Sequence, residues 1–197
     1  MNARELRNLL GGIIVPRPIA FVSTVGEDGV FNLAPFSFFA PLCHRPMLVG
    51  FCVSRKKGGE LKDTLKNIQD TGEFVLNLVT EALAVPMSQS SKAYPSYVDE
   101  FKEVGLTPAR TDLVKAPMVA ESPVNAECRL VQILEFGETD RKTSFIVGEV
   151  LRIHVEDELY VDGEIQLAKL KAVGRMGTEH YCYTRDIFEM RRPDALE

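Results

Sequence analysis

The stretch best suited to chemistry is residues 32–39, which read NLAPFSFF. Its three phenylalanines offer flat apolar surface, while Asn32 and Ser37 add an amide and a hydroxyl. Pro35 lacks a backbone N–H, so we expect regular strand pairing to stop at its position. This mixture suits a planar, partly polar ring, which needs apolar walls and hydrogen-bonding groups along one edge. Composition alone favours a simpler alternative, a core strand with aromatic packing.

A second candidate is the basic loop of residues 54–59, SRKKGG, which is followed by Lys62, Asp63 and Thr64. Three consecutive cations, two glycines and a hydroxyl near a predicted helix start are typical of a phosphate-binding loop. The first turn of a helix presents unpaired N–H groups and a partial positive charge, and both attract anions. The alternative is a solvated basic loop in which Asp63 or Thr64 only caps the helix.

The third candidate is the segment of residues 173–177, VGRMG, with Tyr181 shortly after it. Glycines on both sides of Arg175 permit the close approach of a ligand to the backbone. The guanidinium can bind a phosphate or carboxylate through two parallel hydrogen bonds. The alternative is a turn that carries a surface arginine, and the spacing alone favours it.

Other kinds of site find little support in the sequence. His44 adjoins Cys43 and His180 lies near Cys182, but the spacing matches no metal-ligand motif, so we expect no metal. His154 stands in a strand-like run and is expected to be structural. The chain has no G-x-S-x-G or H-E-x-x-H motif, and its carboxylates are scattered through turns. No catalytic acid, base or nucleophile is therefore assigned.

Composition and charge narrow the class of protein. The chain has 197 residues, enough for one domain with a substantial core, and its net charge is −5 at pH 7. A net acidic chain argues against nucleic-acid binding, which needs clustered Lys and Arg. The cysteines form no CxxC pair, the N-terminus lacks an apolar signal core, and no apolar run could span a membrane. We therefore expect a cytoplasmic protein that binds neither nucleic acid nor membranes.

The elements that must position these candidates are mainly strands. Residues 19–25 predict a strand, and a turn at residues 27–29 leads into a return strand that holds the first candidate. Residues 47–53 are continuously apolar and predict a strand buried on both faces. Residues 73–79 return to strand character after the basic loop.

Two helices follow from apolar spacing and stop signals. Residues 3–10 predict a short helix that the glycines at 11–12 end. Residues 62–71 predict a second helix, because a leucine and an isoleucine three positions apart share one face. Gly72 is a natural stop for that helix.

The middle of the chain, residues 88–123, is polar and rich in proline. We interpret it as an insertion with short helices inside a single domain of residues 1–197. Strand patterns resume at residues 125–136 and 144–155. Several closely spaced strands without βαβ alternation predict a closed antiparallel barrel with helical additions. A Rossmann fold is excluded, because no glycine-rich turn follows the first strand and opens a helix.

In chain order, these segments resemble the flavin reductase-like, FMN-binding split-barrel family, and the resemblance covers nearly the whole chain. The motifs that carry it are PRPIAFVST (16–24), NLAPFSFF (32–39), KDTLKNIQDTGEFVLNLV (62–79), SPVNAEC (122–128), GEVLRIHV (148–155) and GRMG (174–177) with Tyr181.

The resemblance implies a mostly β fold, a six-stranded antiparallel Greek-key split barrel, and a homodimer with FMN near the subunit interface. It implies that residues 32–39 contact the isoalloxazine ring. It also implies that the basic loop and the start of the following helix bind the phosphate. Carried over position by position, the expected ring contacts are Asn32, Ala34, Pro35, Phe36, Ser37 and Phe38. The expected phosphate contacts are Ser54, Arg55, Lys56, Lys62 and Thr64. Further residues expected near the cofactor are Arg17, Arg175 and Tyr181.

The resemblance implies an NAD(P)H-dependent flavin oxidoreductase that passes electrons to free flavin, iron or a partner protein. An alternative is a non-catalytic FMN carrier, like flavoredoxin, that a partner protein reduces. Two features motivate it: the 88–123 insertion, and the segment 137–144 (GETDRKTS), which stands where reductase members carry a histidine. A third possibility is a binding or structural module without flavin. The sequence does not distinguish NADH from NADPH as the electron donor, and it does not identify the electron acceptor.

Overall fold

The computed structural model describes residues 1–138, 142–191 and 193. Its helices are α1 (Ala3–Ile13), α2 (Asp63–Thr71), α3 (Ala84–Ser90), α4 (Glu100–Val104) and α5 (Leu167–Leu170), with 3-10 turns η1 (Glu81–Leu83) and η3 (Asp157–Leu159). Its strands are β1 (Ala20–Val25), β2 (Phe31–Phe36), β3 (Phe39–His44), β4 (Met47–Ser54), β5 (Glu73–Asn77), β6 (Pro108–Ala109), β7 (Met118–Val119), β8 (Val124–Phe136), β9 (Thr143–Val155), β10 (Tyr160–Val161), β11 (Glu164–Ile165), β12 (Val173–Arg175) and β13 (Tyr181–Tyr183). The predicted class, mostly β with helical additions, is confirmed.

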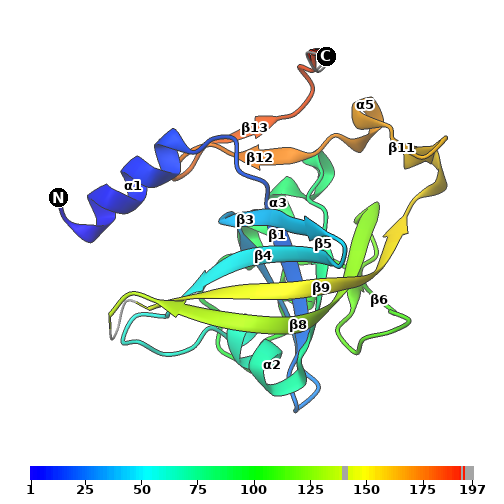
Figure 1. The fold of residues 1–197 in the computed structure, drawn as a ribbon. Helices are drawn as coiled ribbons and strands as arrows, with labels where there is room; N and C mark the ends of the chain where they lie inside the picture. The colour runs from blue at the N-terminus through cyan, green and yellow to red at the C-terminus, as the bar shows by residue number, and fades with distance from the viewer. Residues whose placement is uncertain (139–141, 192, 194–197) are drawn as a thin grey trace.

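One antiparallel sheet of seven strands forms the body, in the order β2-β1-β5-β8-β9-β4-β3. Its outer strands, β2 and β3, are consecutive in the chain and are separated only by Ser37 and Phe38. The chain therefore passes from one edge of the sheet to the other at this bend, so the sheet must curl strongly (Figure 1). At the bend, the backbone N–H of Cys52 donates to the carbonyl of Phe38 (2.9 Å). The sheet therefore has seven strands where six were predicted, because Ser37 and Phe38 separate β2 from β3.

The β1–β2 hairpin forms as predicted, but it continues through its proline. Pro35 pairs with Phe21 inside the ladder, so the prediction that pairing stops at Pro35 is wrong. Because β2 is an outer strand of the sheet, a missing N–H is tolerated on the side that has no partner strand. The backbone edge of β2 therefore faces away from β1 and remains open to other groups.

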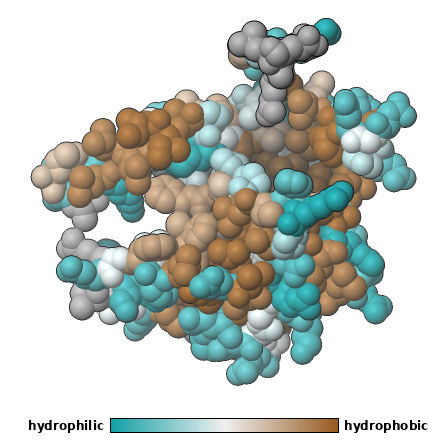
Figure 2. Space-filling view, viewed as in Figure 1, coloured by the Kyte–Doolittle hydropathy of each residue, from teal (hydrophilic) through white to brown (hydrophobic). Residues whose placement is uncertain are grey.

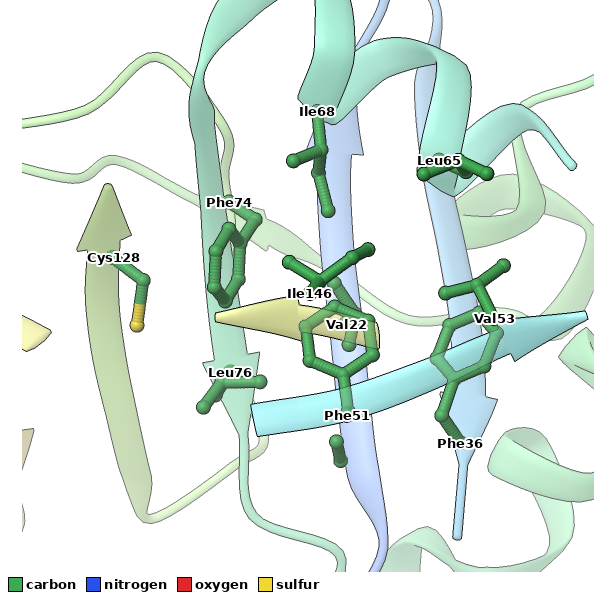
Figure 3. Close-up of a cluster of buried hydrophobic side chains, with 11 residues drawn as sticks. Val22, Phe36, Phe51, Val53, Leu65, Ile68, Phe74, Leu76, Cys128 and Ile146 are labelled. Carbon is green, nitrogen blue, oxygen red and sulfur yellow. The ribbon is translucent and has the colours of Figure 1, made fainter. Parts of the chain in front are cut away.

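An aromatic core fills the inside of the curled sheet. The ring centroid of Phe51 lies 5.4 Å from that of Phe36 and 5.5 Å from that of Phe74. Leu65 and Ile68 of α2 point from above into this cluster (Figure 3) and are fully buried. Burying each of these side chains contributes about 1.5–3 kcal/mol. This burial anchors α2 on the sheet and so fixes the start of the helix beside β2.

Helix α2 matches its predicted length and stop. It begins after Lys62 and ends at Gly72, whose φ of 72° lies in the left-handed region that favours glycine. The N–H of Gly72 donates to the carbonyl of Ile68 (2.9 Å), which closes the last turn. The basic residue before the helix is therefore held at its N-terminus.

The insertion packs against the face of β1 and β2 opposite to the aromatic core. Met87 of α3 and Phe101 of α4 are buried with Phe21 and Leu33 in a second apolar cluster. The rings of Phe31 and Phe101 meet edge to face at 6.1 Å. This cluster places α3, α4 and the loop between them alongside β2.

Helix α1 projects from the body next to β12 and β13 (Figure 1). It continues to Ile13, so the prediction that glycines 11–12 end it is wrong. Arg17 explains the extension, because its guanidinium donates to the carbonyls of Gly11 and Ile14 at the helix end (2.8 Å for Ile14). The exposed side of α1 is largely apolar (Figure 2): Leu9 is 50% exposed and Ile13 is 67% exposed.

Membrane-spanning helices are absent from the part of the chain that the structure describes, since none of its helices has both the length and the apolar character needed to cross a membrane. The four cysteines are free.

Candidate functional site

Three adjoining hollows lie along the open edge of β2. The arginine hollow, about 390 Å³, lies between α1, the β2–β3 bend and the β12–β13 hairpin. The lysine hollow, about 170 Å³, lies between β2, the start of α2 and residues 90–94. The acidic hollow, about 370 Å³, lies between the β1–β2 turn, α2 and residues 96–100. The arginine and lysine hollows share the lining residues Pro35, Lys62 and Ser91. The lysine and acidic hollows share Asn32, Lys56, Asp63 and Glu100.

The structure brings nearly all of the predicted site residues to this groove. Those that line the arginine hollow are Arg17, Pro35, Ser37, Phe38, Lys62, Arg175 and Tyr181. Those that line the lysine hollow are Asn32, Ala34, Pro35, Phe36, Lys56, Lys62 and Thr64. Ser54 and Arg55 line none of the hollows described above.

Lys62 is the central cation of the groove. It is the N-cap residue of α2 and lines both the arginine and the lysine hollow. Its ammonium lies 5.6 Å from the centroid of the Phe36 ring, and within the described part of the chain no carboxylate pairs with it. Burial, followed by repulsion from Lys56, lowers the pKa of Lys62. A bound anion would therefore stabilise its charged form.

Two of the three cations of the basic loop already have partners, and the third, Lys57, is exposed and lines none of the three hollows. The ammonium of Lys56 lies 2.9 Å from Asp63 Oδ2. The guanidinium of Arg55 lies 2.6 Å from Glu135 Oε2 on β8, and this arginine side chain is only 9% exposed. Ser54 is exposed at the end of β4. Lys62 is thus the cation of this loop region best placed to meet an anion in the groove.

A hydrogen bond fixes the wall between β2 and α2. The side-chain amide of Asn32 donates to the hydroxyl of Thr64 (2.9 Å), and both side chains are buried. Since the Thr64 oxygen accepts this bond, its own hydroxyl proton is free to be donated to a ligand in the lysine hollow.

The phenylalanines of the first candidate divide between core and site. Phe36 is buried in the aromatic core, as the simpler interpretation of the sequence expects. Phe38 is 40% exposed and lines the arginine hollow, with the guanidinium of Arg17 5.8 Å from its ring centroid. The alternation of side chains along an extended chain produces this division. Residues 32–39 therefore contribute both to the aromatic core and to the wall of the groove, which were the two alternatives in the sequence analysis.

Arg17 is buried at the arginine hollow and joins α1 to the β12–β13 loop. Besides its bonds to Gly11 and Ile14, it donates to the carbonyl of Gly177 (3.2 Å). Its Nε is buried and has no partner among the described atoms. Burial, and then the charge of Arg175, lower the pKa of Arg17. All these bonds go to neutral carbonyls, so the positive charge itself is uncompensated.

Arg175 and Tyr181 face each other across the β12–β13 hairpin. They pair in its register, and the guanidinium donates to the Tyr181 hydroxyl while lying 4.5 Å from the ring centroid. Arg175 also donates to the carbonyls of Gly177 (3.2 Å) and Thr178. The predicted C-terminal pair thus forms one wall of the arginine hollow.

Glu100 is a site residue that the sequence analysis missed. It opens α4, is 7% exposed, and lines both the lysine and the acidic hollow. Its carboxylate accepts the backbone N–H of Leu33 on the open edge of β2 (3.1 Å). Burial, helped by the charges of Asp63 and Asp99 and opposed by backbone hydrogen bonds, raises the pKa of Glu100 to about 7. Its segment, DEFKEV, carries no local signal that separates this glutamate from its neighbours.

A separate polar cluster lies outside the groove. Glu127 is fully buried: its Oε2 accepts the backbone N–H groups of Leu113 and Val114, and its Oε1 accepts that of Asp112 and lies 2.6 Å from His154 Nε2. Burial raises the pKa of Glu127, but these hydrogen bonds together outweigh it and lower the pKa. Asp112, Glu127 and His154 bring their ligand atoms within 4.8 Å of one another. Because the carboxylate is occupied in fastening this loop to β8, we interpret the cluster as structural.

Comparisons with known proteins give a consistent result. The model of the flavin reductase like domain matches residues 12–168. A protein of Aquifex aeolicus (strain VF5), named only as uncharacterized, is 38% identical over 177 residues, which are 89% of this chain and 88% of that protein. The structure of nitrilotriacetate monooxygenase component B from Bacillus cereus superposes with a TM-score of 0.93 at 32% identity, covering 96% of this chain and 95% of the other. That of 2-nitrobenzoate 2-nitroreductase NbaA from Pseudomonas fluorescens gives 0.90 at 28% identity, covering 100% and 95%.

The raised pKa of Glu100 makes a prediction for stability. The folded protein holds this proton up to about pH 7, whereas an unfolded glutamate releases it near its ordinary value of 4.5. The free energy of unfolding should therefore fall as the pH rises between these values, by at most about 3 kcal/mol. Glu100→Gln should abolish this part of the slope, which urea denaturation at pH 5 and pH 8 would measure. Glu103→Gln, exposed on the same helix, is the matched control and should keep the wild-type slope. An unchanged slope in Glu100→Gln would contradict the assignment.

Proposed function

This chain belongs to the flavin reductase-like family, and from that premise we propose that it is an FMN-binding flavoprotein, an NAD(P)H-dependent flavin oxidoreductase. The observation that carries the proposal is Lys62, a half-buried cation at the start of α2 and beside the open edge of β2, which pairs with no carboxylate among the described residues. A mononucleotide needs both features, since its phosphate is anionic and its ring has polar atoms along one edge.

The residues of the groove fit FMN at both of its ends. At the phosphate end, the Lys62 ammonium and the Thr64 hydroxyl are donors that pair with no carboxylate among the described residues, and they lie at the N-terminus of α2, whose first turn also carries Asp63. At the ring end, Pro35, Ser37 and Phe38 supply apolar surface, a hydroxyl and an open backbone edge. When bound, FMN would supply the redox chemistry by accepting and releasing electrons.

The protein's own residues bind and orient in this proposal. Asn32 holds Thr64 toward the lysine hollow, and Arg17 holds the end of α1 against the β12–β13 loop. Residues of α1, Arg7 and Asn8 among them, line the side of the arginine hollow away from β2. The helix therefore limits the access of water to the space beside the proposed ring position. The contribution of the protein is positioning and electrostatics, and no general acid or base is required.

A second candidate function is an FMN carrier that a partner protein reduces. The insertion favours it, because Ser91, Lys92 and Tyr94 line the lysine hollow and narrow the groove. The sequence also favours a carrier, because residues 137–144 stand where reductase members carry a histidine. Of these, residues 139–141 lie outside the described residues. Under either function, the electrons pass on to free flavin, iron or a protein partner.

We further propose that two copies of the chain associate through α1. Leu6, Leu9, Leu10 and Ile13 on this helix are each more than 40% exposed, and together they form a continuous apolar side of it. Exposed apolar surface of this kind on a soluble domain marks an interaction site. This proposal concerns the assembly and is independent of the flavin chemistry.

The proposal of an oxidoreductase predicts a yellow protein with turnover. The purified protein should show flavin absorbance, and released flavin should co-migrate with FMN on chromatography. The FMN-loaded protein should oxidise NADH or NADPH when free flavin is added. Bound FMN without turnover of either nucleotide would contradict the reductase and favour the carrier, and a colourless protein that takes up no FMN would contradict both.

The placement of the phosphate predicts a selective loss of affinity. Lys62→Ala should weaken FMN binding about 10- to 100-fold, since a charge-assisted hydrogen bond contributes about 1.5–3 kcal/mol. It should leave riboflavin, which lacks the phosphate, nearly unaffected. Fluorescence quenching of each flavin measures both affinities. Lys57→Ala, an exposed lysine of the same loop, is the control and should behave as wild type. Equal losses for FMN and riboflavin would place the phosphate elsewhere.

The association through α1 predicts a defined change in mass. Light scattering of the wild-type protein should give twice the 22.0 kDa mass of one chain. Leu9→Glu places a charge in the proposed interface and should shift the protein to monomers. Glu5→Gln, on the same helix but outside its apolar side, is the matched control and should remain dimeric. A wild-type protein that is monomeric at all concentrations would refute the proposal.

A further inference from the structure

The arginine hollow differs in charge from the rest of the chain. The chain as a whole carries a net charge of −5. Among the described residues that line this hollow there is no aspartate or glutamate, whereas its cations are Arg7, Arg17, Lys62 and Arg175. The acidic hollow, at the other end of the groove, has four carboxylates, Glu27, Asp28, Asp63 and Glu100, and two lysines, Lys56 and Lys66. Positive charge is therefore concentrated at one end of the groove.

None of these four cations pairs with a carboxylate in the part of the chain that the structure describes. The ion pairs of the chain instead use other cations, such as Arg55, Lys56 and Arg185. Arg17 is 6% exposed, has a buried Nε without a partner, and is repelled by Arg175. Holding like charges together in a partly buried space costs free energy, and a bound anion would offset that cost.

Of the three arginines that line the hollow, Arg7 is the one whose donors are all unused, while Lys62, the remaining cation, is assigned to the phosphate end of the proposed flavin site. Arg17 and Arg175 spend their donors on carbonyl oxygens and on the Tyr181 hydroxyl. The Arg7 side chain forms no hydrogen bond or ion pair with any described residue, and it is exposed at the rim of the hollow. A guanidinium in that state can bind a carboxylate through two parallel bonds. The carbonyl contacts of Arg17 hold the end of α1, the helix that carries Arg7, beside the hollow.

The remaining walls favour a small, flat ligand. Ile19, Pro35, Phe38 and Met87 supply apolar surface, and the aromatic ring of Tyr181 lies beside Arg175. The volume of the hollow is about 390 Å³, near the lower end for ligand pockets. Because the proposed flavin ring would take up part of this space, the hollow suits a single-ring acid better than a whole dinucleotide.

We propose that the arginine hollow is a carboxylate-binding subsite for the second substrate of the flavin site, selective for small aromatic acids, with Arg7 as the residue that binds the carboxylate. The inference rests on the proposed function for its redox context, because Pro35, Ser37 and Phe38 form the wall that this hollow shares with the proposed ring position. Binding itself is a property of the hollow and is measured separately.

The test compares benzoate with benzamide, which have nearly the same shape and differ in charge. Isothermal titration calorimetry on the full chain, with and without added FMN, should show benzoate binding at least tenfold more tightly than benzamide. Arg7→Ala should weaken benzoate about tenfold and leave benzamide nearly unchanged. Arg4→Ala removes an equally exposed arginine from the same helix, outside the hollow, and should match the wild type.

The possible results separate this inference from the proposed function. Equal affinity for benzoate and benzamide, or a benzoate affinity that Arg7→Ala does not change, would overturn the subsite. If Arg7→Ala weakened the binding of NADPH but not that of benzoate, the hollow would bind a phosphate. That result would also overturn the carboxylate assignment. Failure to bind FMN would refute the proposed function, while calorimetry without FMN would still decide whether the hollow prefers the carboxylate.

Discussion

The bend between β2 and β3 is the constraint on which the rest of the structure depends. Two residues, Ser37 and Phe38, carry the chain from one edge of the seven-stranded sheet to the other. The sheet must curl strongly around the aromatic core to allow this, and β2 is left with an open backbone edge. Residues of β2 line all three hollows, so the geometry of the groove follows from the curl of the sheet.

The elements packed around β2 then give the groove its chemistry. Burial of Leu65 and Ile68 fixes α2, which presents Lys62, while the cluster around Phe101 fixes α4, which presents Glu100. Arg17 ties α1 to the β12–β13 loop. The groove is therefore cationic near α1 and acidic near the β1–β2 turn, although the two ends are joined by shared residues. Such a gradient can orient a ligand that is anionic at defined points.

Much of this arrangement could be predicted from local patterns. The hairpin, α2 with its glycine stop, and the long strands β8 and β9 follow from apolar periodicity and turn residues, which act over short distances. Predictions failed where an interaction was not local. Glycines at 11–12 do not end α1, because Arg17 satisfies carbonyls at the helix end, and Pro35 does not end its ladder, because β2 is an edge strand. Arg55 and Lys56 look equivalent to Lys62 in the sequence, but Glu135 and Asp63 pair with them.

The sequence by itself determined the family, the mostly β class and the identity of most groove residues, because motifs and periodicity are properties of neighbouring positions. Only the tertiary structure decided which charges remain uncompensated. Arg7 and Glu100 carry no distinguishing signal in the chain, and their roles arise from what is packed beside them. The ionisation of a side chain depends on its burial and on nearby charges in space. The lowered pKa of Lys62 and the raised pKa of Glu100 therefore follow from the packing of α2 and α4 beside β2, which the sequence does not display.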